Sequence, residues 1–435
     1  MGLDNTGKGT TLRRRLWILC LGALLIGIAL PGYIAHRRSP TGGPDDADLS
    51  VIDETVTASD NGLTHLLEAV RLCRFNDADR LMADAVWAGE EIPAEKVANL
   101  LKANASALER LNQALEAPQF RLPEAAAHEL DFAPEIPLET EYLVQLLRLA
   151  ALHNASLGDW NAAFDNALDV LRLAQRIEGA NYAVITTTLL SMGYRSDGLE
   201  TLRRLVADAP LEASQAQRWV DLLPDYRSSP AAWKRMWSAE YQQWKALLGW
   251  ISERARQPQW TSGGSVSPTD FSEIDIRALK QQTSRTLRGF AAATRTYQRA
   301  SELDCNNLQE LSFPGSLGTR DSGANGSNNL GAQLSTPDYR GFFMHRCALD
   351  TALAATRTLF ALRAFQQDLG RLPDRLSELV PHYLDAVPTD AFNGAPIQYS
   401  RARKLIYSLG TDGIDPGVDP EAAAASRASS YPIEF

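Results

Sequence analysis

The stretch EYLVQLLRLAALHNASLGDWNAAFDNALDVLRLAQRI, residues 141–177, indicates most about the fold of this chain. Its apolar residues recur every three or four positions on both sides of LGDW, the spacing of two amphipathic helices. Gly158 can adopt the left-handed conformation that ends the first helix, and Asp159 can cap the second. We expect Trp160 and Phe164 to pack back on the first helix, so that the two helices form a hairpin.

The same periodicity predicts a helical-hairpin domain over residues 61–258. The expected helices span residues 61–73, 76–88, 94–116, 139–157, 160–177, 180–207, 212–222 and 230–256. The quoted hairpin resembles a tetratricopeptide-type repeat, and RLCRFNDADRLMADAV is a weaker copy. Because a regular solenoid needs about three stacked units, we expect an irregular array of hairpins. The generic use of such an array is contact with other proteins, and a plain helical domain is the alternative.

An apolar run near the start predicts a transmembrane anchor. Leu16 to Ala35 is a run of uncharged, mostly apolar residues that, at about 1.5 Å each, would span roughly 30 Å of bilayer. Lys8 and three arginines precede it, so the positive-inside rule predicts a single-pass inner-membrane protein with a cytoplasmic N-terminus and a periplasmic bulk. A cleaved signal peptide is the alternative, although no A-x-A-like cleavage site follows the run.

The remaining boundaries follow from composition. Residues 1–15 read as a cytoplasmic tail, and residues 36–60, rich in Pro, Gly and Asp, as a solvated linker. Residues 259–338 combine one helix with Gly/Ser/Asn-rich segments. The net charge of −10 speaks against nucleic-acid binding. The six histidines lack metal-ligand spacing and no catalytic arrangement emerges, so we expect a protein that is not an enzyme.

Six of the nine tryptophans fall in residues 219–260. Trp233, Trp237 and Trp244 recur at helical spacing on one face, and Trp250 lies off that face. One interpretation is core packing. The other is an aromatic binding face for a peptide or glycan, made by these four residues.

Two cysteines flank the Gly/Ser/Asn-rich segment. A disulfide between Cys305 and Cys347 would restrict the unfolded chain and leave Cys73 over. Buried reduced cysteines are the alternative, and the spacing does not decide between the two.

Residues 339–420 predict a small α+β module. A long helix ends at Gly370, a short helix follows, and strands near Pro396–Ser400 and Leu405–Leu409 form a hairpin. Residues 421–435 read as a tail. The whole chain is therefore expected to be mainly α, with an anchor, a helical domain and this module.

Three ordered motifs in the module resemble the C-terminal domain of the type II secretion major pseudopilin. The matching residues are Phe365, Asp368, Gly370, Pro373, Leu376 and Leu379, then Pro388, Asp390, Phe392, Gly394, Pro396 and Tyr399, then Tyr407, Ser408, Gly410, Asp412 and Gly413. The whole chain is similar to bacterial membrane-anchored proteins that place such a module behind a helical region. It departs from true pseudopilins, since the apolar run has no acidic residue and lies far from the module.

The resemblance implies a calcium site in YSLGTDGIDPGVDPE, residues 407–421. Asp412, Asp415 and Asp419 would supply carboxylate oxygens to Ca²⁺, which prefers oxygen ligands. The alternative is a turn with solvated acids.

Together these observations predict a membrane-anchored extracytoplasmic scaffold, associated with the cell envelope or secretion and with protein partners there. The alternative function is an extracytoplasmic ligand-binding or sensor protein that uses the Trp-rich region.

Overall fold

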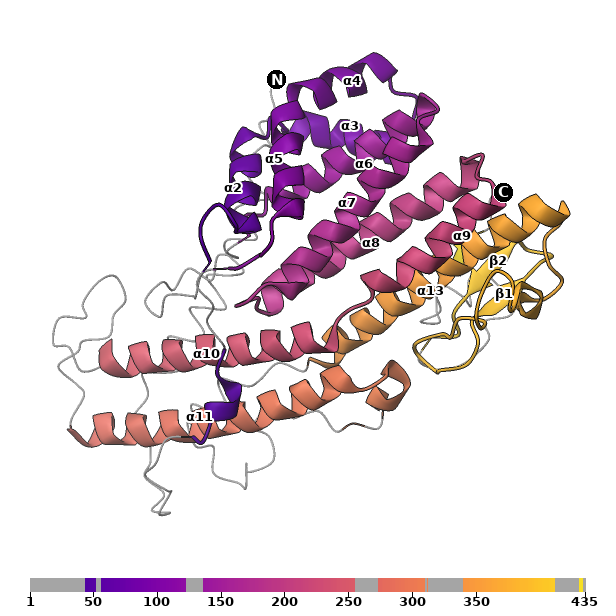
Figure 1. Ribbon diagram of the computed structural model, residues 1–435. Helices are drawn as coiled ribbons and strands as arrows, with labels where there is room; N and C mark the ends of the chain where they lie inside the picture. The colour runs from indigo at the N-terminus through magenta and orange to yellow at the C-terminus, as the bar shows by residue number, and fades with distance from the viewer. Residues whose placement is uncertain are drawn as a thin grey trace, which may run out of the picture.

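A computed structural model describes residues 44–51, 56–122, 136–254, 273–309, 311, 339–410 and 430–432, and helices dominate them (Figure 1). The α-helices are α2 (Gly62–Leu72), α3 (Asp77–Trp87), α4 (Ala94–Ala103), α5 (Ala105–Glu116), α6 (Thr140–Ser156), α7 (Trp160–Gly179), α8 (Ile185–Asp208), α9 (Ala213–Leu222), α10 (Pro230–Arg254), α11 (Glu273–Glu302) and α13 (Arg340–Leu369). Short 3-10 helices are η2 (Ala47–Leu49), η3 (Leu223–Tyr226), η5 (Cys305–Gln309) and η6 (Leu376–Leu379).

The long helices α6, α7 and α8 form the middle of the molecule (Figure 1). Helices α2 to α5 cover one side of this layer, and α9 and α13 pack on the other. The pair α10 and α11 extends beside them as a long antiparallel hairpin. The prediction of a mainly helical chain is therefore confirmed for the described residues.

The hairpin predicted from residues 141–177 is formed by α6 and α7. Gly158 has φ +82° between the two helices, and the Asp159 carboxylate accepts a hydrogen bond from the Ala162 amide at 3.1 Å. Phe164 is buried in the core. The turn chemistry read from LGDW is the one observed.

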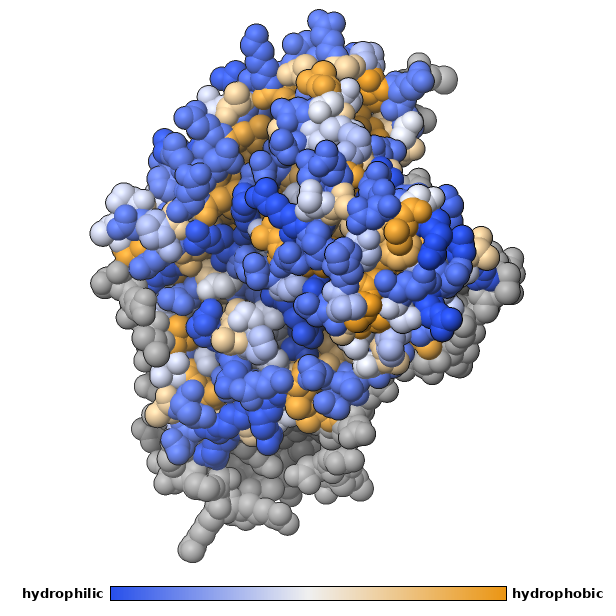
Figure 2. Space-filling view, turned by 45° about the vertical axis from the view of Figure 1, so that its right-hand side comes forward, coloured by the Kyte–Doolittle hydropathy of each residue, from blue (hydrophilic) through white to orange (hydrophobic). Residues whose placement is uncertain are grey.

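Amphipathic packing accounts for the surface as well as the core. Figure 2 shows hydrophilic side chains over most of the visible face, with apolar residues scattered between them. Among the described residues, exposed large apolar side chains such as Leu81 and Leu157 come from different parts of the chain. Single exposed residues of this kind are normal for a folded protein.

The predicted transmembrane anchor requires a correction to the fold class and the localisation. Among the helices that the structure describes, none is both long enough and apolar enough to cross a membrane. The predicted span, Leu16 to Ala35, lies outside the described residues. The architecture observed is a helical assembly with one small sheet, and the single-pass inner-membrane placement is withdrawn.

The C-terminal residues share a core with the helical residues. Helix α13 packs against α8 and α9, and the rings of Phe164, Trp219 and Phe360 meet with centroids 4.9 to 6.0 Å apart. These rings belong to one cluster that extends from α6 to the sheet. The residues predicted as a C-terminal module are thus built into the helical layers.

The small sheet has three antiparallel strands in the order β1-β2-β3. Strands β1 (Gln398–Ser400) and β2 (Leu405–Tyr407) are the predicted hairpin. Strand β3 (Ser430–Pro432) pairs with β2 and comes from the residues that we predicted to be a tail. Tyr431 is buried there opposite Ile406, so part of the tail is structural.

Asp390 joins two of the C-terminal motifs. Its carboxylate is 1% exposed and accepts hydrogen bonds from the Leu409 amide (2.9 Å), the Ser408 hydroxyl (2.8 Å) and the Phe392 amide (3.0 Å). A buried carboxylate needs such donors to offset its lost hydration. The role of Asp390 is to hold the loop before β1 against the end of β2.

The disulfide between Cys305 and Cys347 is present in the structure and joins η5 to α13, with the two Cα atoms 5.7 Å apart. Both cysteines are buried, and Cys73 is a free thiol. The bridge ties the end of the α10–α11 hairpin to the C-terminal helix.

Candidate functional site

The tryptophans proposed as a binding face lie largely in the core. Trp233 and Trp237 are 0% and 1% exposed, and both rings pack against Phe343, that of Trp233 tilted and that of Trp237 stacked. The indole N–H of Trp233 donates to Glu178 (3.0 Å) and that of Trp237 to Ser301 (3.1 Å). The predicted aromatic binding face is therefore wrong at these two positions, because α11 and the start of α13 cover this side of α10.

Of the other two tryptophans, the structure describes the surroundings of Trp244 alone. Trp244 is half-buried, its ring lies 5.7 Å from Phe290, and its indole N–H donates to Glu240. The side chain of Trp250 lies outside the described part of the structure.

The predicted calcium ligands Asp412, Asp415 and Asp419 also lie outside the described residues. Within the residues that the structure does describe, no group of three or more His, Cys, Asp or Glu side chains is placed to hold a metal ion. The calcium site stays a prediction.

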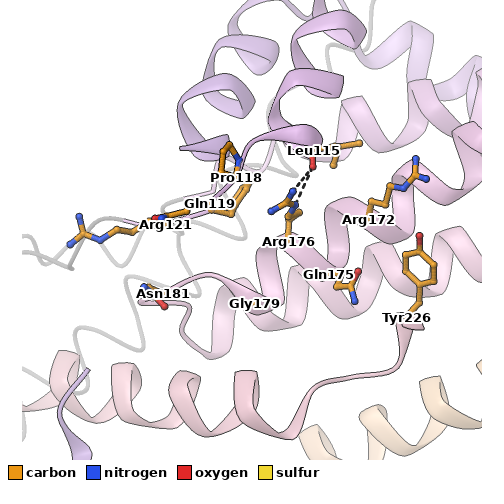
Figure 3. A pocket seen from close by; sticks show the side chains of 11 residues that line it. Leu115, Pro118, Gln119, Arg121, Arg172, Gln175, Arg176, Gly179, Asn181 and Tyr226 are labelled. Atoms are coloured by element: carbon orange, nitrogen blue, oxygen red, sulfur yellow. Dashed lines mark hydrogen bonds between the residues drawn. The ribbon is translucent and has the colours of Figure 1, made fainter. Parts of the chain in front are cut away.

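A polar cleft of about 690 Å³ lies between the end of α5, the second half of α7 and η3 (Figure 3). Among the residues that the structure describes, the charged ones lining the cleft are Arg121, Arg172 and Arg176, and none of the described lining residues is acidic. This is a local concentration of positive charge in a chain whose net charge is −10. The cleft is the candidate functional site.

Helix α7 supplies the centre of the cleft. Arg172 and Arg176 are four residues apart, which places them on the same face of the helix. Arg176 donates from Nε (3.1 Å) and Nη2 (2.7 Å) to the Leu115 carbonyl near the end of α5. Because a guanidinium carries five N–H donors, this contact positions Arg176 and leaves donors over for a ligand.

One end of the cleft is formed by Arg172 and Tyr226, which lie beside each other in Figure 3. Arg172 is held by Asp169, with Nη1 2.7 Å from Oδ1. Burial raises the pKa of Tyr226, so its hydroxyl stays protonated and can donate a hydrogen bond. Asp169 offsets part of the arginine charge but is itself not part of the lining.

The opposite end is formed by two extended segments that follow α5 and α7. Arg121 and Asn181 form a parallel bridge there, and the Leu122 amide donates to the Asn181 carbonyl at 3.2 Å. The Arg121 guanidinium stacks 5.6 Å from the ring of Tyr182. Tyr182, which follows the lining residue Asn181, has φ +63°, a conformation that non-glycine residues rarely adopt.

A buried ionic group lies just beyond the cleft and has a different role. The Glu178 carboxylate pairs with Arg195 and accepts hydrogen bonds from the Trp233 indole and the Ser229 amide (3.1 Å). Both oxygens are engaged by the protein itself. The group therefore fixes the junction of α7, α8 and α10.

Comparison with protein-family models, with curated proteins and with solved structures finds no match for this chain.

Sequence reasoning did not find the cleft. Arg172 and Arg176 stand inside the opening stretch, but polar residues on the outer face of an amphipathic helix usually mark only a solvated face. Arg121 comes from a segment that sequence patterns left unassigned. The tertiary structure alone brings it to the end of α7.

Proposed function

We propose that this chain is a helical scaffold that binds a partner protein through an extended acidic segment seated in the cleft between α5 and α7. The observation that supports this most is that the described lining residues include three arginines and no acidic residue. A helical-hairpin assembly is a common platform for protein contacts. The scaffold predicted from the sequence is thus kept, without its membrane anchor, and the cleft takes the place of the Trp-rich region that the alternative prediction used as a binding face.

The spread of the arginines favours an extended ligand over a single phosphate. Arg121 and Arg172 lie at opposite ends of the cleft, with Arg176 between them (Figure 3). A phosphate ion is bound best by donors that converge on one point. Charges spaced along a groove, with amides such as Gln119 and Gln175 between them, suit a peptide whose acidic side chains are also spaced.

Binding of a fluorescein-labelled octapeptide of glutamate to the full chain tests the proposal. Arg172→Gln and Arg121→Gln should each weaken binding by about fivefold to tenfold, because each removes one charge-assisted contact. Arg80→Gln, on the exposed face of α3, is the matched control and should leave the affinity unchanged.

Two results would contradict the proposal. Equal affinities for the cleft variants and the Arg80→Gln control would mean that the peptide binds elsewhere. Competition by inorganic phosphate as strong as that by the peptide would identify a simple anion site.

A further inference from the structure

The segment Asp45–Leu49, hereafter the clasp, belongs to the residues that we expected to form a solvated linker. It instead lies across both helices of the α10–α11 hairpin (Figure 1). It reaches partners that follow it by about two hundred positions or more in the sequence. The prediction of a solvated linker was wrong for these residues. Composition alone does not show that acidic residues have basic partners far away in the sequence.

The clasp places one apolar side chain in the groove between the helices. Leu49 is 0% exposed. The cluster that surrounds it comes entirely from the hairpin: Tyr241 and Leu248 of α10, Leu287, Phe290 and Ala291 of α11, with Trp244 packed alongside. The hairpin thus provides an apolar pocket that accepts one leucine.

Two aspartates before this leucine bind one helix each, Asp46 to α10 and Asp48 to α11. Asp46 accepts hydrogen bonds from the Tyr241 hydroxyl (2.6 Å) and from Lys245 Nζ (2.7 Å). Arg295 donates hydrogen bonds from Nε (2.8 Å) and Nη2 (2.7 Å) to the two carboxylate oxygens of Asp48, which makes a bidentate ion pair. Hydrogen bonds from Lys245 and Tyr241 lower the pKa of Asp46, so its carboxylate is charged at neutral pH.

The backbone of the clasp is recognised as well. Gln242 Nε2 donates to the Leu49 carbonyl (2.8 Å), and Arg295 Nη2 donates to the Asp45 carbonyl (2.5 Å). The contacts therefore have the composition of a peptide-binding site: one apolar anchor, two fixed charges and main-chain hydrogen bonds.

We propose that the α10–α11 hairpin is a docking site for short segments of the form Asp-x-Asp-Leu, with residues 45–49 of the same chain as its resident ligand. A partner protein that presents such a segment competes with the clasp for the hairpin. This site is separate from the arginine cleft, and its test does not depend on the function proposed for that cleft.

A labelled peptide with the sequence PDDADLSV, residues 44–51, is the probe. In the native full chain the tethered clasp competes at an effective concentration of roughly millimolar, so the peptide should bind weakly. A full-length chain with Asp46→Asn and Leu49→Lys has a vacated groove and should bind the peptide at least about tenfold more tightly. Adding Lys245→Gln and Arg295→Gln to the vacated chain should abolish this gain.

The matched control is the same peptide with the aspartates that correspond to Asp46 and Asp48 changed to asparagine and the leucine changed to alanine. This peptide should not bind. The proposal is overturned if the vacated chain binds PDDADLSV no more tightly than the native chain does. It is equally overturned if the control peptide binds as well as PDDADLSV.

Hydrogen exchange on the native full chain gives an answer even if the vacated chain fails to fold. Saturating PDDADLSV should displace the clasp and speed exchange of the amides of residues 45–50, while exchange in α13 stays unchanged. Unchanged exchange in residues 45–50 at a peptide concentration well above millimolar would exclude displacement.

Discussion

Folding buries the carboxyl of Asp197 on α8 and so disfavours its charged form. Burial, opposed by Arg148 at 3.1 Å and reinforced by Glu200 and Glu141, raises the pKa of its carboxyl from 3.8 to about 6. The Arg148 guanidinium is itself stacked 3.8 Å over the Trp87 ring. The carboxyl therefore gains a proton more readily in the folded state than in the unfolded state.

The sign of the pH effect follows from this difference. Between the unfolded and folded pKa values the native state binds more protons, so the stability contributed by Asp197 falls as pH rises through about 6. From pH 5 to pH 7 the native chain should lose about 1 kcal/mol of unfolding free energy relative to Asp197→Asn. Urea unfolding of both proteins at the two pH values measures it.

Asp385→Asn serves as the control, because the Asp385 side chain is fully exposed. Its unfolding free energy should follow that of the native chain at both pH values. Parallel pH profiles for the native chain and Asp197→Asn would refute the assignment of this titration to Asp197.

At the scale of elements, contacts with distant segments accompany the places where helices end. Residues 94–116 were predicted as one helix, yet the chain divides at Asn104 into α4 and α5. The Asn104 side chain is buried, accepts a hydrogen bond from the Arg74 amide (2.6 Å) and donates to the Leu100 carbonyl (2.9 Å). The spacing of apolar residues within 94–116 carries no information about this contact with Arg74. It therefore could not predict that the helix breaks at Asn104.

The contact between α7 and α8 depends on a glycine within α8. A Cβ at Gly198 would lie 2.6 Å from Leu171 Cδ2, closer than atoms can approach. Gly193 occupies the same helix, is exposed, and would place a Cβ in open space. Both glycines lie inside α8, but only Gly198 is packed against a neighbouring helix.

This pair makes a matched test of helix packing. Gly198→Ala should lower the unfolding free energy by about 1–2 kcal/mol, because the forced separation outweighs the better helix propensity of alanine. Gly193→Ala should raise it by up to about 1 kcal/mol, since only the propensity changes. Thermal and urea unfolding would compare the variants, and shifts in the same direction would refute the close approach of α7 and α8.

At the scale of the whole molecule, helix α13 connects the cores. Phe343 at its start packs with Trp237 and Tyr297, and Phe360 and Phe365 near its end belong to the cluster of α7, α8 and α9. Both the start and the end of this helix consequently pack against residues from outside the C-terminal region.

Residues 339–435 made alone should therefore not fold cooperatively. Without α8 to α11, the apolar residues of α13 remain in contact with water, and a small domain has little other apolar area to bury. Circular dichroism on heating should show no sharp transition, with or without millimolar calcium. Mixing with a separate chain of residues 44–311 should restore one, and a sharp transition of the isolated fragment would contradict the shared core.

Several sequence-based expectations remain predictions. The pseudopilin resemblance, the calcium ligands and the absence of enzymatic activity are not tested by the fold, and the scaffold function is carried forward as a proposal. The motif residues do have clear structural roles, since Ser408, directly after β2, donates a hydrogen bond to Asp390 in the loop before β1.

The sequence by itself determined the elements whose signals are local: the α6–α7 hairpin with its Gly158 and Asp159 turn, the order of the helices, and the β1–β2 hairpin. Periodicity and capping act over a few residues, so they are readable without the fold. Only the tertiary structure decided that Trp233 and Trp237 are core, that the clasp covers α10 and α11, and that Arg121 joins Arg172 in one cleft. These outcomes depend on contacts between residues far apart in sequence, which the pattern of a single segment does not encode.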